Sequence, residues 1–271
     1  MENKTINAVT NAGAANALLE KALADAEPAK EVAKITPPSD TLVNLPGGLI
    51  LFTGEIVKTA EIRELTGRDE EALAKVTGFG RIFNTILSRA VVSVGLEKAD
   101  DRILDQLLAS DRDELLLGIA KATFGNTASL AGWCVECNEY KEVEIDIDTD
   151  IKRKTLQDPI YDRTFKVKGK KNEYTVTLPT GVTQRQLAAN DDKNMAELST
   201  LLLEQTVLEI DGTPLVSKIQ VQNLPLLDRR KISQEIASRN CGPQFDDITL
   251  PCGECDGEVV VPISLGALFR F

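Results

Sequence analysis

The sequence predicts an α+β protein made of two related helix-plus-small-sheet lobes, which a shared zinc site joins and an N-terminal helical arm precedes. Three observations predict this fold: short helical and strand patterns alternate, one residue pattern recurs in both halves, and each half ends near a Cys-x-x-C pair. We place the arm at residues 1–46, the first lobe at 47–157 and the second lobe at 158–271.

The arm is rich in alanine, and residues 11–33 predict one helix that is interrupted near Pro28. A lone helix of this kind is only marginally stable in water. Pro37, Pro38 and Pro46 indicate an extended tether after it. Two interpretations stay open, a disordered tail or an arm that becomes ordered on a partner.

An Asp-Arg pair begins a predicted helix at Asp111 in the first half and at Asp228 in the second. In both helices an Ile-Ala pair follows eight residues later, and a glycine, Gly125 or Gly242, follows after fourteen. The isoleucines lie on the apolar face of each helix, and the glycines suit its C-terminal cap. A chance match of this order is improbable, so we predict an internal duplication.

Further elements support two halves of similar design. Helices are predicted over 81–92 and 195–207, and each leads into a short strand. The second lobe is expected to begin with a strand over 174–178, after a polar connection over 158–171. Each half therefore reads as helix, strand, helix and cysteine hairpin.

Four of the five cysteines form the pairs Cys134-Val-Glu-Cys137 and Cys252-Gly-Glu-Cys255, and the chain has no histidine. Zinc prefers four tetrahedral ligands, and each Cys-x-x-C turn supplies two of them. We therefore predict one structural Zn²⁺ ion bound by Cys134, Cys137, Cys252 and Cys255. A two-fold axis between the duplicated halves would bring the two hairpins together around it.

Alternatives for these cysteines stay open: redox-active thiols, thiols without a metal, another metal, or a site shared between two chains. A redox pair is expected at the start of a helix. Pro251, Gly253 and Gly257 around Cys252 instead favour a turn between strands. The fifth residue, Cys241, is expected to be a small buried apolar side chain.

Charge and composition restrict the function. Asp and Glu number 42 against 31 Lys and Arg, and the net charge of −11 repels phosphate backbones. No apolar run is long enough to span a membrane, and no secretory leader is recognisable. The lack of histidine removes the commonest general base. We expect an intracellular, non-enzymatic protein whose partners are other proteins, with no membrane and no nucleic acid.

Short motifs carry a family resemblance. Leu45-Pro-Gly-Gly48 and the segment Ile-Arg-Glu-Leu-Thr-Gly-Arg-Asp-Glu-Glu over 62–71 look like openings of tailed-phage tail and baseplate proteins. Leu178-Pro-Thr-Gly181 repeats the theme. With the Asp-Arg helix and the cysteine pair that follows it, residues 40–270 resemble the T-even-type baseplate hub and hub-assembly family of contractile-tailed bacteriophages.

The resemblance implies a tail-assembly role without catalysis, with other phage tail and baseplate proteins as partners. It leaves open whether such a protein stays in the virion or acts as a chaperone, and we expect assembly in the host cytoplasm and a final location in the tail baseplate of the virion. Four functions are therefore weighed: a structural subunit of the baseplate hub, a transient assembly chaperone absent from the virion, a zinc-ribbon nucleic-acid-binding protein, and an enzyme with an unusual Asp/Glu/Lys site.

Overall fold

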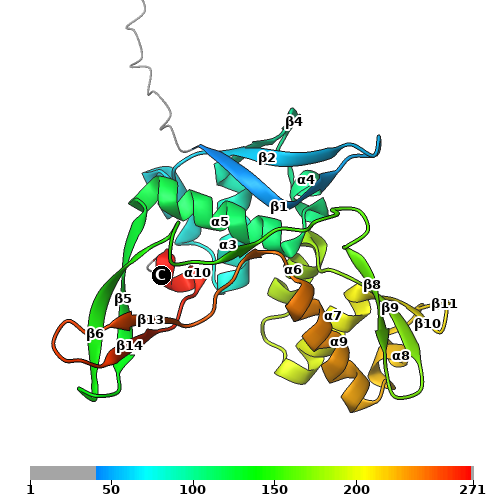
Figure 1. Cartoon of the computed structure of the whole chain (residues 1–271). Coiled ribbons are helices and arrows are strands. Elements are labelled where there is room, and N and C mark those ends of the chain that lie inside the picture. The colour runs from blue at the N-terminus through cyan, green and yellow to red at the C-terminus, as the bar shows by residue number, and fades with distance from the viewer. Residues whose placement is uncertain (1–40, 270–271) are drawn as a thin grey trace, which may run out of the picture. The chain divides into compact units, whose positions relative to one another are not determined.

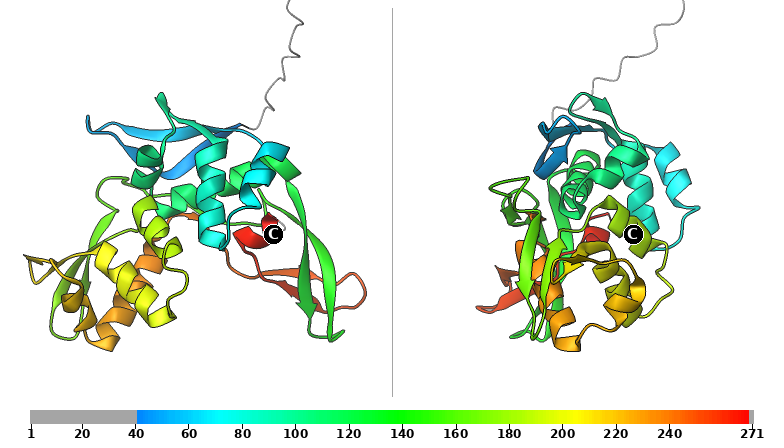
Figure 2. Two further views of the ribbon diagram at one scale, coloured as in Figure 1. Left: turned by 180° about the vertical axis from the view of Figure 1, so that it is seen from behind. Right: turned by 90° about the vertical axis from the view of Figure 1, so that its right-hand side faces the viewer.

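The computed structural model describes residues 41–269, and Figures 1 and 2 show their arrangement. All of these residues belong to one of the two units of the chain, Pro38–Phe271. They form a mixed α+β structure with several small antiparallel sheets, as the sequence predicted. The predicted helix of the arm lies outside the described residues.

The first module, residues 42–124, is a four-stranded sheet of order β1-β2-β3-β4 packed against helices. Its strands are β1 (Leu42–Ile50), β2 (Ile56–Ile62), β3 (Val91–Val94) and β4 (Glu97–Lys98). Its helices are α2 (Gly67–Leu73), α3 (Phe79–Ala90), α4 (Asp101–Gln106) and α5 (Ala109–Phe124). The core forms where buried side chains of α5, such as Leu115 and Ile119, meet the inner face of the sheet.

The second module, residues 164–239, repeats this order of elements, and its sheet has the matching order β8-β9-β10-β11. Its strands are β8 (Thr164–Lys168), β9 (Glu173–Thr177), β10 (Val207–Ile210) and β11 (Thr213–Pro214). Its helices are α6 (Gly181–Ala188), α7 (Met195–Thr206), α8 (Lys218–Gln222) and α9 (Leu226–Arg239). Both modules thus run strand, strand, helix, helix, strand, strand, helix, helix.

A further four-stranded sheet, which we call the cysteine sheet, contains both Cys-x-x-C hairpins in the order β13-β14-β5-β6. Its strands are β5 (Thr127–Cys134), β6 (Glu139–Asp146), β13 (Ile248–Pro251) and β14 (Glu258–Val261). The remaining elements are β7 (Arg153–Lys154), β12 (Gly242–Pro243) and α10 (Leu265–Leu268). Leu117 of α5 packs into the core of this sheet, so α5 contacts both the first module and the cysteine sheet.

Three sequence-based expectations need correction. The sheet already begins at Leu42, inside the predicted arm, because Val43 and Leu45 alternate with exposed neighbours and are buried. The predicted polar connection contains β8, whose Phe165 and Val167 are buried between exposed threonine and lysine side chains. Finally, the hairpins do not end separate lobes but share one sheet.

The two Asp-Arg pairs make equivalent contacts in the two modules. Each arginine donates to a carbonyl eight residues earlier and to a polar side chain on the preceding long helix. The acceptors are Leu104 and Asn84 for Arg112, and Val221 and Thr200 for Arg229. The planar guanidinium thereby fixes two helices of each module against a third.

The aspartates of these pairs connect the same helices to the strands. Asp111 accepts a hydrogen bond from the Gly47 N–H at 2.7 Å, and Asp228 accepts one from the Lys170 N–H at 2.8 Å. Both carboxyl groups are buried. Burial raises the pKa of Asp111, which costs less when backbone donors replace the lost water.

Candidate metal centre

The four predicted cysteines come together in one chain. Their sulfur atoms all lie within 4.8 Å of one another. The two pairs are separated by more than a hundred residues in sequence, so tertiary folding alone brings them to one place. Cys134 and Cys252 are buried, and Cys137 and Cys255 are partly exposed.

The register of the cysteine sheet explains this convergence. β5 ends at Cys134, and β14 begins at Glu258 directly after the second cysteine turn. Because β14 and β5 are antiparallel, with Val259 opposite Cys134, both turns lie at the same end of the sheet. The second strand of one hairpin pairs with the first strand of the other, which is a side-by-side arrangement rather than the expected two-fold one.

Local backbone geometry points each turn at the metal position. The first turn closes with a hydrogen bond of 2.9 Å from the Asn138 N–H to the Cys134 carbonyl, and Asn138 adopts a left-handed φ of 56°. The second closes with a bond of 2.9 Å from the Cys252 N–H to the Gly257 carbonyl. The Cys137 N–H donates to the Cys134 sulfur at 3.4 Å, and the Gly257 N–H donates to the Cys255 sulfur at 3.3 Å, so each turn directs a backbone donor at one of its sulfurs.

The spacing of the sulfurs fits a tetrahedral ion. With a Zn–S distance of about 2.3 Å, the sulfurs of such a site lie about 3.8 Å apart. The measured separations are 3.7 Å for Cys134–Cys255, 3.9 Å for Cys137–Cys252 and 3.3 Å for Cys137–Cys255. All exceed the covalent S–S length of about 2.05 Å. The donor set therefore fits one thiophilic metal ion.

The pKa values of the thiols diverge. The Glu254 backbone N–H lowers the pKa of Cys252 to about 7, whereas the contact with Cys255 raises the pKa of Cys137 to about 12. Four thiolates at this spacing repel one another. A divalent cation removes that repulsion and releases the thiol protons when it binds.

The surroundings of the cysteine turns are acidic. The turns carry several exposed carboxylates, namely Glu136, Glu139, Glu254, Asp256 and Glu258. Lys141 is the cation that links the hairpins, because its Nζ lies 2.6 Å from Glu254 and 3.1 Å from Glu139. Sequence reasoning missed Lys141, whose role depends on the pairing of distant hairpins. This end of the sheet is electrostatically unsuited to a phosphate backbone.

Cys241 lies apart from this cluster. It is buried among apolar side chains of the second module, as expected, and its sulfur is 2.9 Å from the Ser110 hydroxyl oxygen. Burial raises the pKa of Cys241 to about 11. Its place in the apolar core and its protonated thiol indicate a packing role.

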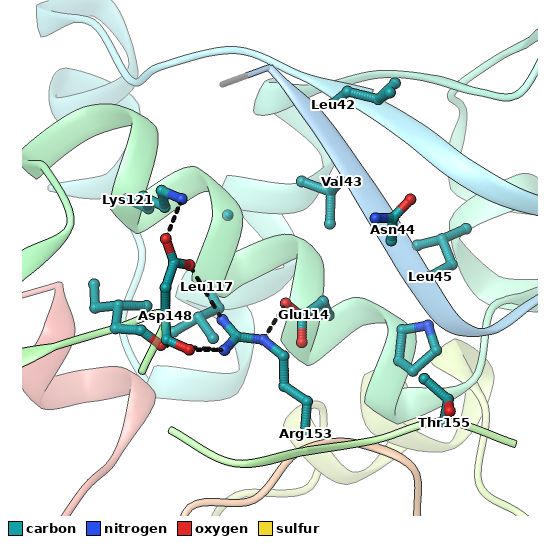
Figure 3. Close-up of a pocket in the computed structure, with 13 residues that line it drawn as sticks. Leu42, Val43, Asn44, Leu45, Glu114, Leu117, Lys121, Asp148, Arg153 and Thr155 are labelled. Carbon is teal, nitrogen blue, oxygen red and sulfur yellow. Dashed lines mark hydrogen bonds and ion pairs between the residues drawn. The ribbon is translucent and has the colours of Figure 1, made fainter. Parts of the chain in front are cut away.

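A pocket of about 360 Å³, lined by both apolar and charged side chains, lies between β1, α5 and the segment that contains β7 (Figure 3). Arg153 crosses it and contacts Glu114 at 2.9 Å and Asp148 at 3.8 Å. Lys121 pairs with Asp148 at 2.6 Å. These opposite charges pair across the pocket and link α5 to the segment after β6, while the buried Glu114 Oε2 has no hydrogen-bond partner among the described residues.

Within residues 41–269, no helix has the length and apolar character needed to cross a membrane. Comparisons with known protein families, with curated proteins and with solved structures found no match to this chain. The site geometry and the sequence motifs therefore carry the functional argument.

Proposed function

We propose that the protein is a non-enzymatic structural protein in which one Zn²⁺ ion fastens its two halves together. The observation that carries this proposal is the meeting of four cysteine sulfurs from two hairpins that lie more than a hundred residues apart in the sequence. A four-thiolate site leaves no open coordination position, so the ion stabilises the fold and does not activate a substrate. Cys134, Cys137, Cys252 and Cys255 are its ligands.

Metal analysis of purified protein tests this assignment. We expect one zinc per chain, and we expect Cys137→Ser and Cys255→Ser each to lose that ion, because each removes one of four ligands. Cys241→Ser is the matched control and should retain it. Different ions lost by the two ligand variants, or an unchanged zinc content in both, would rule out a single shared site.

We also propose that the two modules arose by internal duplication. The support is the identical order of eight elements, the matching sheet order and the equivalent hydrogen bonds of Arg112 and Arg229. The aligned pair of Thr-Gly helix starts is Thr66-Gly67 and Thr180-Gly181, each with a capping box. This pairing replaces the sequence-based one, which matched Leu45-Pro-Gly-Gly48 to the second motif.

For the biological role, we propose a structural subunit of a contractile-tailed phage baseplate hub. The short motifs support this, as does an acidic, two-module body suited to protein partners. A transient assembly chaperone is the second candidate, since it has the same fold requirements. The acidic cysteine turns favour both over a zinc-ribbon nucleic-acid-binding protein.

Mass spectrometry of purified particles of the source phage separates these roles. A hub subunit is expected in the particle at a small fixed copy number. Detection in infected-cell lysate but not in particles would assign the chaperone role. Absence of any tail-assembly defect after deletion of the gene would exclude both.

A further inference from the structure

Helix α6 of the second module is docked on the first module through backbone contacts. The Gly181 N–H donates to the Leu107 carbonyl at 2.9 Å, and the Ala109 N–H donates to the Pro179 carbonyl at 2.9 Å. These two bonds flank an isolated antiparallel bridge between Leu108 and Thr180. The start of α6 is therefore held at the start of α5.

Side chains complete this contact. Gln184 accepts from Arg112 Nε at 2.7 Å and donates to Asp113 at 3.1 Å. A Cβ atom on Gly80 would lie 2.6 Å from the Ala188 Cβ, so α3 and α6 are in close contact. Thus α6 fills a groove between α3, α4 and α5, at whose centre lies Arg112.

The equivalent groove of the second module is open. It lies between α7, α8 and α9, measures about 850 Å³, and is lined by Arg229, the counterpart of Arg112. Leu226 is 64% exposed, whereas its counterpart Ala109 is 7% exposed under α6. Met195 at the groove edge is 80% exposed. No segment within residues 41–269 occupies this groove.

The helix that fills the groove of the first module, α6, also has an uncovered counterpart, which is α2. α2 holds the place in the first module that α6 holds in the second, and both helices start with Thr-Gly. A Cβ atom on Gly181 would lie 2.8 Å from Arg112 Nη1 and would clash with the Leu104 carbonyl oxygen. A Cβ atom on Gly67 meets nothing within 4 Å. The molecule therefore has one docked and one exposed helix start of the same design.

The two uncovered surfaces, the start of α2 and the groove between α7, α8 and α9, carry opposite charges. Gln184 lies four residues after the Thr180 cap, and the α2 residue at that position is Glu70, which is exposed and is followed by exposed Glu71. The open groove presents Arg229 and Arg230. Within residues 41–269, none of these four charged side chains forms an ion pair. The acidic helix and the basic groove are thus complementary.

The backbone of the open groove suits the same contact. Pro225 takes the position of Leu108 and has no N–H to donate. Neither backbone hydrogen bond of the observed contact uses the Leu108 N–H, because one uses the Leu107 carbonyl and the other uses the Ala109 N–H. A proline is therefore compatible with an identical antiparallel bridge.

We propose that copies of this chain associate head to tail, with the start of α2 of one copy docked in the groove between α7, α8 and α9 of the next. The contact reproduces between chains the docking of α6 that each chain contains within itself. Such a heterologous interface produces a ring or an open chain, not a closed two-fold dimer. The proposed interface follows from the structural match between the two modules, and it requires neither the metal ion nor a role in a phage.

Light scattering and sedimentation of the full, zinc-loaded protein test the proposal over a range of concentration and salt. We expect the apparent molecular mass of the wild-type protein to rise with protein concentration and to fall with salt concentration. Gly67→Ala, E70R/E71R and R230E should each weaken association by roughly tenfold or more while circular dichroism stays unchanged. E55R/E61R and K152E change exposed charges elsewhere and should associate normally.

Mixing gives the sharpest test of the head-to-tail arrangement. Gly67→Ala keeps its groove, and R230E keeps its α2, so an equal mixture should form a two-chain species and nothing larger. In the triple variant E70R/E71R/R230E the charge at position 230 is reversed as well while Arg229 stays basic, so association should recover in part relative to E70R/E71R. A wild-type protein that stays monomeric at all concentrations, or a mixture that stays monomeric, would overturn the proposal. Zinc content and presence in particles, measured separately, test the proposed function.

Discussion

Two carboxylates of this protein, Asp113 and Asp69, have opposite environments. Burial raises the pKa of Asp113 to about 6, although Gln184 and Arg112 partly oppose the shift. The bidentate contact with Arg63 instead holds the pKa of Asp69 well below its usual range. Folding thus favours the protonated form of Asp113 and the charged form of Asp69, which gives the two groups opposite effects on stability.

For Asp113, the folded-state pKa exceeds the unfolded value near 4, so its contribution is fully present at low pH and is lost as pH rises to about 6. Asp113→Asn carries no charge and escapes this loss. We expect the variant to gain about 2 kcal/mol relative to wild type between pH 4.5 and pH 7.5, measured by urea unfolding.

Asp69→Asn is the matched comparison and should behave in the opposite way. The Asp69 carboxylate of the wild type stabilises the fold fully once pH is above about 4. The free energy of unfolding of the variant should therefore fall further below that of the wild type as pH rises towards about 4. A parallel pH dependence of the two variants would contradict these assignments.

At the scale of elements, the contact between α6 and the first module is one of the joints that hold the modules together. Gly181→Ala places a methyl group against the Leu104 carbonyl and the Arg112 guanidinium. We expect the free energy of unfolding to fall by about 1–3 kcal/mol, the usual cost of overpacking. Thermal or urea unfolding at high dilution measures it.

Gly67→Ala is the control for that change, since it makes the same substitution at the matching helix start, where space is open. At high dilution its stability should stay within about 0.5 kcal/mol of wild type. Equal losses in both variants would mean that the substitution acts through the helix start itself and not through the joint.

At the scale of the whole molecule, a metal ion at the four-cysteine cluster would reinforce the short pairing between β14 and β5 in the cysteine sheet. β5 and β6 pair along their full length, whereas β14 meets β5 only at Val259–Cys134 and Val260–Trp133. Metal chelation should therefore loosen the β13–β14 hairpin first. Hydrogen exchange is expected to rise over 248–261 while α5, which lies in two cores, stays protected. Uniform deprotection of both regions would contradict this order.

Sequence periodicity predicted the long helices well. α3, α5, α7 and α9 all lie within a few residues of their expected positions, because their apolar residues repeat with helical spacing. β8 was missed because lysines alternate with its buried residues and mask a strand as a polar linker. The strand character of β1 was missed because Pro46 and two glycines suggested a tether.

Sequence patterns predicted which four cysteines come together, because these four form two Cys-x-x-C pairs and the chain has no histidine. The same patterns predicted the recurring Asp-Arg helices. Tertiary folding places both cysteine hairpins side by side in one sheet, links them through Lys141, and leaves one Arg-centred groove filled and its counterpart open. These features depend on pairing between segments far apart in sequence, and local residue patterns do not specify such pairing.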